Sequence, residues 1–545
     1  MSPAFTGTGT LLRFALRRDR IRLPAWIAAL WLLTVASVAS FAGTYPTAAD
    51  RAQLAATLDS PAMLAVSGPR GYLADYTYGA MTAHQLLGFV TVFAGLMSAL
   101  TVVRHTRAEE EKGRAELLRS SVVGRHAQLT AALVLAAAAS LLLGVLLWLS
   151  LPALGPAGLT FSGSLLYGAG HAAAGLVFAG VAAVAAQLTP FARGATGLAS
   201  AAIGLSYVLR AAGDAGGPAA AAVLSWLTPT GWIQRTYAYV ADRWWPLLLC
   251  AALAAATMAA AYALSDRRDV GAGLRPPRRG RTTASGALTR PLGFALRLQR
   301  GVLAGFAAGM LVFGLMYGSV LGEAEEMIAD NERLRRTIED LGGGVAESFA
   351  SAIMSMLAIV AACLSVLAVL RARAEETARR AEPVLATALS RARWAGSHLA
   401  VALAGGTAVM LLGGFGFGVA GALTAGGTGP DPGLDTGLLW RLTSASLAYA
   451  PALWVISGLT LLLFGWLPRL SAAAWLLPAY AFVTVYLGEL IDMPDPLAWL
   501  SPLGHVPRVP AAGLTWTPLL VMTALAAALC CAGLAGFRRR DLHTP

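Results

Sequence analysis

The chain has 545 residues, of which 57% are hydrophobic and only 13% charged, and its formal net charge is +12. So apolar a composition excludes an ordinary soluble domain. Basic residues at membrane surfaces contact anionic headgroups, so the positive charge does not indicate a nucleic-acid partner. We therefore expect membrane lipid, and no nucleic acid, among the partners of this chain.

Apolar windows of about 20 residues, long enough to cross a bilayer, recur along the whole chain. They predict an all-α polytopic membrane protein with about 12 transmembrane helices. The predicted spans are residues 23–43, 84–103, 127–150, 166–188, 196–212, 246–264, 301–321, 349–370, 395–423, 441–465, 472–490 and 517–536. Arginines before the first span resemble the start of a signal peptide, but the spans that follow indicate a retained helix.

The basic residues predict the orientation of these spans. With the N-terminus inside the cell, most of the 41 Lys and Arg residues fall in cytoplasmic segments, as the positive-inside rule requires. We therefore expect both termini in the cytoplasm. Lys112 is the single lysine among many arginines, which is typical of a bacterial genome rich in G and C. The expected location is the bacterial cytoplasmic (inner or plasma) membrane.

The segment before the first span, from Phe14 to Arg22, alternates apolar and basic residues at helical spacing. This pattern predicts an amphipathic helix that lies in the membrane interface. It recurs from Phe294 to Arg300. We therefore expect the same structural elbow before the seventh span.

A charged loop follows the second span and is repeated later in the chain. Residues 107–125, RAEEEKGRAELLRSSVVGR, return as residues 373–391, RAEETARRAEPVLATALSR, at a constant offset of 266. Both copies lie between two predicted spans, so each is expected to form a cytoplasmic hairpin. The charged positions considered below are Arg107, Glu109, Glu110, Arg114 and Glu116, with the counterparts Arg373, Glu375, Glu376, Arg380 and Glu382.

Two further motifs recur in the same order. The segment Trp226–Gly231, WLTPTG, matches Trp499–Gly504, WLSPLG, and its Pro and Gly predict a broken or re-entrant element before the last span of each half. The tripeptide Arg267–Asp269 matches Arg539–Asp541 just after those spans.

Four motifs recur in the same order, and each set of four accompanies six predicted spans. The chain is therefore predicted to consist of two halves. The halves are residues 1–270 and 290–545, joined by a Pro-, Gly-, Ser- and Arg-rich cytoplasmic linker, residues 271–289. Because six is even, both halves enter the membrane from the same side and form a parallel repeat about an axis along the membrane normal. Any transport pathway is then expected between the halves.

Known catalytic motifs are absent from the sequence. The only lysine lies in EEEKGR, which is no Walker A loop, and neither a zinc-protease motif nor a nucleophile elbow is present. We therefore expect no catalytic residue, no metal site and no cofactor in this chain.

The chain resembles the permease subunits of ABC-2-type ABC transporters, and specifically the fused twelve-span exporters of polyketide antibiotics (tetronasin-type). The resemblance rests on the elbow, the RAEE loop, the WL(S/T)PxG segment and the closing RRD, and it extends over essentially the whole chain. It implies that six spans form one permease half and that two copies of a separate ATPase subunit supply ATP hydrolysis with their own ATP and magnesium. In this family the ATPase docks on the loop between spans two and three.

The resemblance assigns ATPase docking to the ten charged loop positions given above. An alternative is a generic solvated loop held by its own ion pairs. We favour docking, because a generic loop need not retain the same charges across a duplication. The implied mechanism is alternating access, in which ATP closes the ATPase dimer and the halves rock about their interface.

The resemblance also implies a substrate path lined by the second and fifth spans of each half. The corresponding residues are Gln85, Phe89, Phe93, Met97, Tyr207, Met354, Met356, Tyr480 and Tyr486. Met and aromatic side chains suit hydrophobic or amphipathic compounds such as antibiotics and drugs. In membrane spans they are more often core or lipid-facing residues.

Two other functions stay open. An ion-coupled secondary drug transporter would use buried polar groups as a relay. The candidates are His84, Gln85, His171, Gln187, Arg210, Asp214, Glu489 and Asp492, most of which lie at span ends. A non-transporting membrane scaffold would use the repeated loops to bind a partner other than an ATPase.

Overall fold

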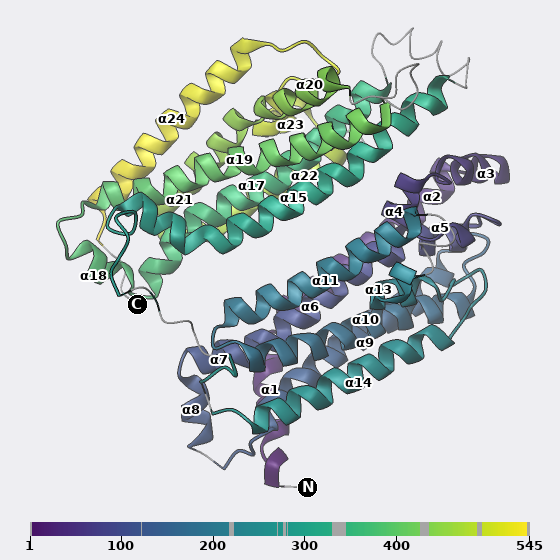
Figure 1. The fold of residues 1–545 in the computed structure, drawn as a ribbon, viewed down its shortest axis with the longest axis horizontal. Coiled ribbons are helices and arrows are strands. Elements are labelled where there is room, and N and C mark those ends of the chain that lie inside the picture. The colour runs from purple at the N-terminus through teal and green to yellow at the C-terminus, as the bar shows by residue number, and fades with distance from the viewer. Residues whose placement is uncertain are drawn as a thin grey trace. The chain divides into compact units, whose positions relative to one another are not determined.

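The computed structural model describes residues 3–120, 122–216, 223–269, 271–275, 280, 282–329, 345–425, 435–487 and 493–541. This described part is helical and contains no β-strand, which confirms the predicted all-α class (Figure 1). The chain divides into two compact units: unit 1, Met1–Gly280, and unit 2, Arg281–Pro545.

Unit 1 contains long helices joined by short helical turns. They are η1 (Pro3–Phe5), α1 (Thr8–Arg18), α2 (Arg22–Thr44), α3 (Ala48–Thr57), α4 (Pro61–Ser67), η2 (Arg70–Tyr72), α5 (Tyr78–Thr82), the π-helical turn η3 (Ala83–Leu87), α6 (Gly88–His105), α7 (Arg107–Glu111), α8 (Arg114–Arg119), α9 (Ala127–Ala153), α10 (Phe161–Leu188), α11 (Ala192–Ala215), α13 (Pro229–Gln234) and α14 (Trp245–Asp266).

Helix α10 is the central element of unit 1 and packs against α6, α9, α11 and α14. It begins at Thr160, whose hydroxyl accepts a hydrogen bond from the Gly163 amide. Small residues allow close approach to α9, since a Cβ at Gly168 would overlap the Gly144 carbonyl. Such contacts are a usual means of joining helices in a bilayer, where burial of apolar surface gives little driving force.

Unit 2 repeats this plan with longer continuous helices. They are α15 (Pro291–Ala329), α17 (Val345–Thr377), α18 (Ala381–Leu385), α19 (Arg391–Ala425), α20 (Thr436–Leu447), α21 (Ala450–Trp466), η5 (Pro468–Trp475), α22 (Leu476–Phe482), the π-helical turn η6 (Val483–Leu487), α23 (Asp495–Ala498), η7 (Pro502–His505) and α24 (Trp516–Arg539). Helix α19 packs against α15, α17, α20 and α21. A Cβ at Gly314 of α15 would overlap the Gly413 carbonyl of α19.

Eleven helical stretches of the described chain are long and apolar enough to cross a membrane, and each overlaps a predicted span. The chain is therefore a multi-pass membrane protein. The predicted span over residues 472–490 is not among them. Its described part consists of η5, α22 and η6, and residues 488–490 lie outside the described residues. Pro478 and the π-helical turn interrupt regular helical hydrogen bonding there, so twelve spans are not confirmed.

The predicted elbow is a separate helix only in unit 1. There α1 ends at Asp19, whose buried carboxylate contacts His105 Nε2 at 2.6 Å and Arg104 Nε at 2.9 Å. At the repeat offset of 280 the counterpart of Asp19 is Gln299, which lies within the continuous helix α15. The expectation of a second separate elbow is wrong, because Gln299 supplies no charge to hold a turn at that point.

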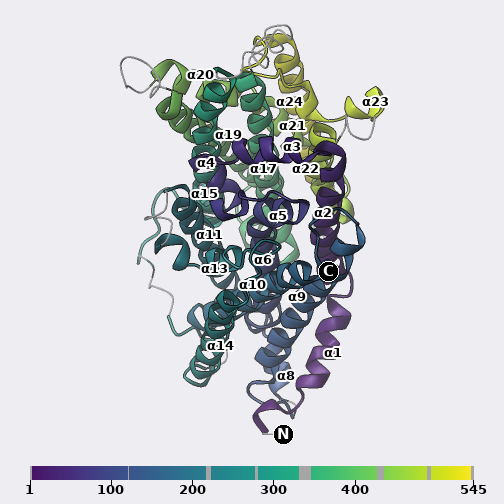
Figure 2. The same ribbon diagram turned by 90° about the vertical axis from the view of Figure 1, so that its right-hand side faces the viewer.

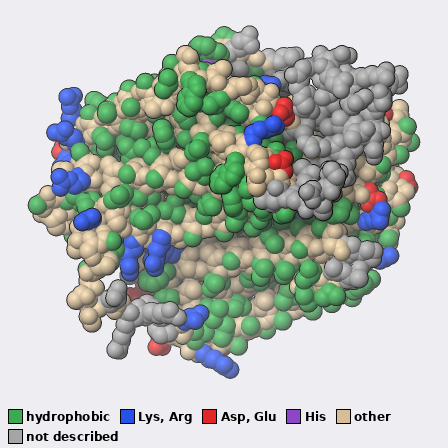
Figure 3. Space-filling view, turned by 45° about the horizontal axis from the view of Figure 1, so that its top comes forward, with side chains coloured by type: hydrophobic (Ala, Val, Ile, Leu, Met, Phe, Trp, Pro, Cys, Tyr) green, Lys and Arg blue, Asp and Glu red, His purple; other side chains and the backbone are tan. Residues whose placement is uncertain are grey.

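The two ends of unit 1 differ. Helices α1, α7 and α8 lie at one end, whereas α3, α4 and α5 lie at the other (Figures 1 and 2). Hydrophobic side chains cover broad areas of the face shown in Figure 3, as expected for a surface that contacts lipid. The predicted broken elements are the short helices α13 and η7.

Candidate coupling site at the loop helices

The repeated charged loop begins at the end of a helix in each unit, the short α7 in unit 1 and the long α17 in unit 2, and the same turn follows. In unit 1, α7 ends with the Gly113 amide bonded to the Glu110 carbonyl, and Gly113 has φ of 71°. In unit 2 the Arg379 amide bonds to the Glu376 carbonyl, and Arg379 has φ of 58°. Gly113 and Arg379 are counterparts at the offset of 266, so the duplication preserves a left-handed turn even where the residue is not glycine.

In unit 1 the loop is bonded to the C-terminal end of the last span. Arg268 donates from Nη2 to Glu110 Oε1 at 2.7 Å and from Nη1 to Oε2 at 2.8 Å. Arg107 Nη1 donates to the same Oε2 at 2.9 Å, and its Nε donates to the Ala186 carbonyl at 2.8 Å. Gln187 accepts from Arg268 Nε at 2.6 Å. We name Arg107, Glu110, Gln187 and Arg268 the Glu110 cluster.

Unit 2 contains the corresponding arrangement. Arg540 donates from Nη1 to Glu376 Oε1 at 2.7 Å and from Nη2 to Oε2 at 2.8 Å. Arg373 Nη1 lies 3.4 Å from Glu376 Oε2. The Arg540 guanidinium also lies 4.9 Å from the ring centroid of Phe537. We name Arg373, Glu376 and Arg540 the Glu376 cluster.

The last charge of each repeated loop makes a similar contact. Arg125 Nη2 donates to the Ser265 and Asp266 carbonyls at the end of α14. Its counterpart Arg391 donates to the Arg540 carbonyl after α24. The RAEE and RRD motifs thus bind each other in both units. This pairing was not predicted from the sequence, although the complementary charges and joint repetition of the two motifs were signals of it.

The first glutamate of each loop has a different partner in the two units. Glu109 accepts from Arg18 of α1 at 2.6 Å. Its counterpart Glu375 is held by Arg371 at 2.7 Å and by Arg380 Nε at 2.7 Å. The loop of unit 1 is therefore joined to the elbow helix, whereas that of unit 2 is held by arginines of its own segment.

The ten predicted docking positions separate into an inward and an outward group. Side chains within ion-pair clusters and largely shielded from solvent are Arg107, Glu109, Glu110, Arg373, Glu375 and Glu376. Exposed residues are Arg114, Glu116, Arg380 and Glu382. Within this second group, Arg114 and Arg380 also pair with the buried carboxylates of Glu109 and Glu375, so a partner protein can contact Glu116 and Glu382 with the least disturbance of the ion-pair clusters.

The predicted pathway residues have mixed environments. Met97 and Met354 are fully packed core residues, whereas Phe89 is 42% exposed and its ring contacts that of Phe93. Gln85 donates to the Tyr76 hydroxyl and Tyr207 donates to the Val66 carbonyl. Met356 and Tyr480 are half-buried, and the Tyr480 hydroxyl donates to the Leu497 carbonyl. Tyr486 belongs to η6. Their role in transport stays a prediction.

The candidate relay residues that the structure describes do not form one chain of hydrogen bonds. His84 Nδ1 lies 3.0 Å from the Tyr76 hydroxyl, whereas His171 Nδ1 bonds to the Tyr167 carbonyl and Gln187 belongs to the Glu110 cluster. Arg210 and Asp214 lie together near the end of α11. Glu489 and Asp492 lie outside the described residues.

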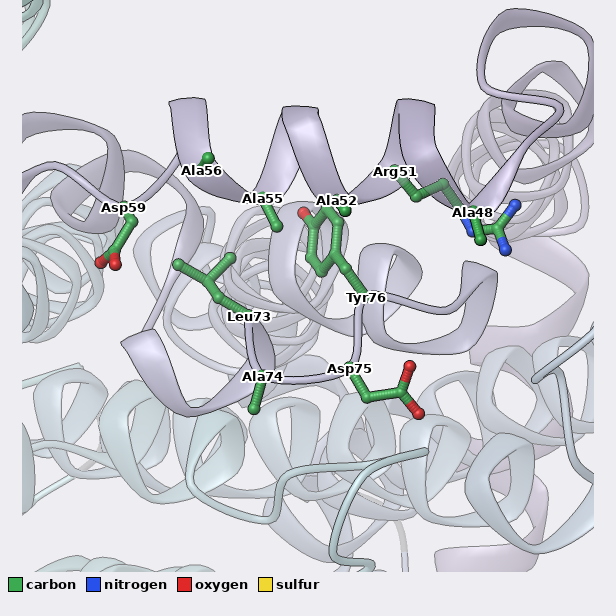
Figure 4. A pocket seen from close by; sticks show the side chains of 10 residues that line it. All are labelled: Ala48, Arg51, Ala52, Ala55, Ala56, Asp59, Leu73, Ala74, Asp75 and Tyr76. Atoms are coloured by element: carbon green, nitrogen blue, oxygen red, sulfur yellow. The ribbon is translucent and has the colours of Figure 1, made fainter.

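A cavity of about 330 Å³ lies between α3 and the segment before α5 (Figure 4). Its lining is Ala48, Arg51, Ala52, Ala55, Ala56, Asp59, Leu73, Ala74, Asp75 and Tyr76. Burial raises the pKa of the Tyr76 phenol, so its hydroxyl stays protonated. The Gly68 carbonyl can only accept, so His84 Nε2 donates to it at 3.2 Å, and in the neutral ring Nδ1 then accepts from the Tyr76 hydroxyl at 3.0 Å. The same hydroxyl accepts from Gln85 Nε2.

Comparison with known proteins gives two matches that extend over nearly the whole chain. The family model described as "Multidrug efflux system permease Rv1217c, C-terminal domain" matches residues 9–264 and residues 288–538, one stretch in each unit. The chain is also 41% identical to the multidrug efflux system permease protein Rv1217c of Mycobacterium tuberculosis over 544 residues. That alignment spans 99% of this chain and 96% of that protein.

Proposed function

The chain belongs to the family of the multidrug efflux permease Rv1217c, and on this premise we propose that it is the membrane permease of an ATP-driven ABC-2-type exporter. Its substrates are hydrophobic or amphipathic compounds, including polyketide antibiotics and drugs. It acts in the bacterial cytoplasmic membrane with both termini in the cytoplasm. Two copies of a separate ATPase subunit bind ATP and magnesium, because the single lysine of the chain lies in no Walker A loop.

The observation that carries this proposal is the ion pair between each repeated loop segment and the C-terminal end of the last span of its unit. An ATPase that contacts the exposed residues Arg114 and Glu116 would push on α7 and α8. The bidentate pair between Glu110 and Arg268 would then transmit the displacement to α14, since such pairs hold both distance and orientation. Glu376 and Arg540 would do the same for α24. Movement of both loops as the ATPase dimer closes drives alternating access.

Charge reversal on the exposed positions tests the docking. The chain is co-expressed with the ATPase encoded beside it and reconstituted in lipid nanodiscs. The variants are Glu116→Arg in one loop and Glu382→Arg in the other, because Arg114 and Arg380 also pair with the buried Glu109 and Glu375. Reversed charges across a protein interface cost several kcal/mol, so drug-stimulated ATP hydrolysis should fall about tenfold or more.

Arg290→Glu serves as the matched control, because Arg290 is exposed and lies outside both loops. It should leave ATP hydrolysis and assembly unchanged. Full activity of both loop variants would refute docking at these residues. Export that follows an imposed proton gradient without any ATPase would support the ion-coupled alternative instead.

A further inference from the structure

Among the residues that the structure describes, a buried arginine near the C-terminal end of α11 has no hydrogen-bond acceptor. Arg210 is 0% exposed, and its Nε, Nη1 and Nη2 atoms are all buried without a hydrogen-bond partner in this described part. Unsatisfied buried donors are uncommon, and a buried guanidinium carries both a charge and five N–H groups. Within membrane-spanning helices such a group is a costly feature that usually serves a function.

The neighbouring carboxylate does not satisfy Arg210. Asp214 Oδ1 accepts from the Ser225 hydroxyl at 2.9 Å and from Arg235 Nη1 at 3.2 Å. Its other oxygen, Oδ2, lies 3.6 Å from Arg210 Nη1, which is too long for a hydrogen bond. Asp214 therefore weakens the local positive charge but gives the N–H groups of Arg210 no hydrogen-bond acceptor.

The guanidinium is held in a defined position. Its Cζ lies 4.3 Å from the ring centroid of Tyr207. The Tyr207 hydroxyl donates to the Val66 carbonyl of α4 at 3.1 Å, which fixes the ring. Stacking of a guanidinium on an aromatic ring leaves its edge free for a planar, bidentate acceptor.

Unit 2 does not repeat this arrangement. The WLTPTG and WLSPLG segments correspond at an offset of 273, which also aligns Arg235 with Arg508. At that offset Arg210 and Asp214 fall on Val483 and Leu487. An acceptor that needs a buried arginine would thus bind once per chain, in unit 1.

We propose that Arg210 binds the carboxylate of an amphipathic compound at the end of unit 1 away from the loop helices. A carboxylate matches the unsatisfied N–H edge of the guanidinium in geometry and charge. The further statement that the bound compound is transported rests on the proposed function. Binding of the carboxylate itself does not, because it requires neither ATP nor an ATPase.

The test uses the full chain in lipid nanodiscs without ATPase. The probe is 11-(dansylamino)undecanoic acid, and its methyl ester is the uncharged comparison. The unmodified chain should bind the acid about tenfold or more tightly than the ester, since a charged hydrogen-bonded pair contributes about 1.5–3 kcal/mol. Arg210→Met should bind both probes alike, and Arg210→Lys should retain part of the preference. Arg193→Met is the matched control on the same helix and should behave like the unmodified chain.

Thermal unfolding separates binding from a structural role. Arg210→Met should unfold at the same or a higher temperature than the unmodified chain without probe, because it removes unsatisfied buried donors. The acid should raise the unfolding temperature only where Arg210 is present. An undiminished preference for the acid in Arg210→Met would overturn the proposal. So would an Arg210-dependent stabilisation by chloride together with none by the acid, which would assign the site to an inorganic ion.

Discussion

At the scale of single residues, the charges repeated by the duplication are mainly structural partners of one another. Glu110 and Arg268 are separated by 158 positions but form two hydrogen bonds, and Glu376 and Arg540 do so across 164 positions. The side chains of Glu110 and Arg268 are only 4% and 6% exposed. Burial makes each charge dependent on its partner, because an unpaired buried ion is strongly destabilising.

Glu110→Gln should therefore destabilise unit 1. The substitution leaves two buried arginines, Arg107 and Arg268, without a carboxylate, at a cost of about 3–5 kcal/mol. The unfolding temperature of the purified chain, followed by tryptophan fluorescence, should fall clearly. Glu116→Gln is the control and should leave it unchanged, since Glu116 is exposed. An equal effect of both substitutions would contradict a special role for the Glu110 cluster.

At the scale of elements, the turn that follows α7 in unit 1 and α17 in unit 2 shows what the duplication has kept. Gly113 and Arg379 occupy the same left-handed turn, although only glycine adopts that conformation without steric cost. The turn reverses the chain so that the exposed residues Arg114 and Arg380 follow directly. The backbone conformation is thus retained where the side chain has changed.

Arg379→Gly should stabilise unit 2, whereas Gly113→Arg should destabilise unit 1. A non-glycine residue in the left-handed region costs roughly 1–2 kcal/mol, so the two unfolding temperatures should move in opposite directions. Differential scanning of both variants measures the shifts. Arg290→Gly, in an exposed position outside the loops, controls for loss of an arginine alone. Shifts of the same sign would show that the turn does not determine the effect.

At the scale of the whole molecule, each unit contains a complete cluster of its own. The Glu110 and Glu376 clusters share no residue and lie in different compact units. Substitutions in independent clusters usually have additive effects, within about 0.3–0.5 kcal/mol.

The double variant Glu110→Gln with Glu376→Gln should accordingly show the sum of the two single effects on stability. Chemical denaturation of the two single variants, the double variant and the unmodified chain completes the cycle. A double variant that is no less stable than either single variant would show that the two clusters are energetically coupled and not independent.

The helical class, the positions of eleven spans and the repeated loops could be predicted from sequence. Hydropathy depends only on neighbouring residues, and a repeat is found by comparing the sequence with itself. Tertiary structure decided which charges meet. Four further candidate membrane spans separate Glu110 from its partner Arg268 along the chain, and nothing local indicates that Asp214 is engaged by Ser225 and Arg235. It also decided that Asp19 ends α1 whereas Gln299 continues α15. Such outcomes depend on which side chains packing brings within hydrogen-bond distance, and a linear pattern does not contain that information.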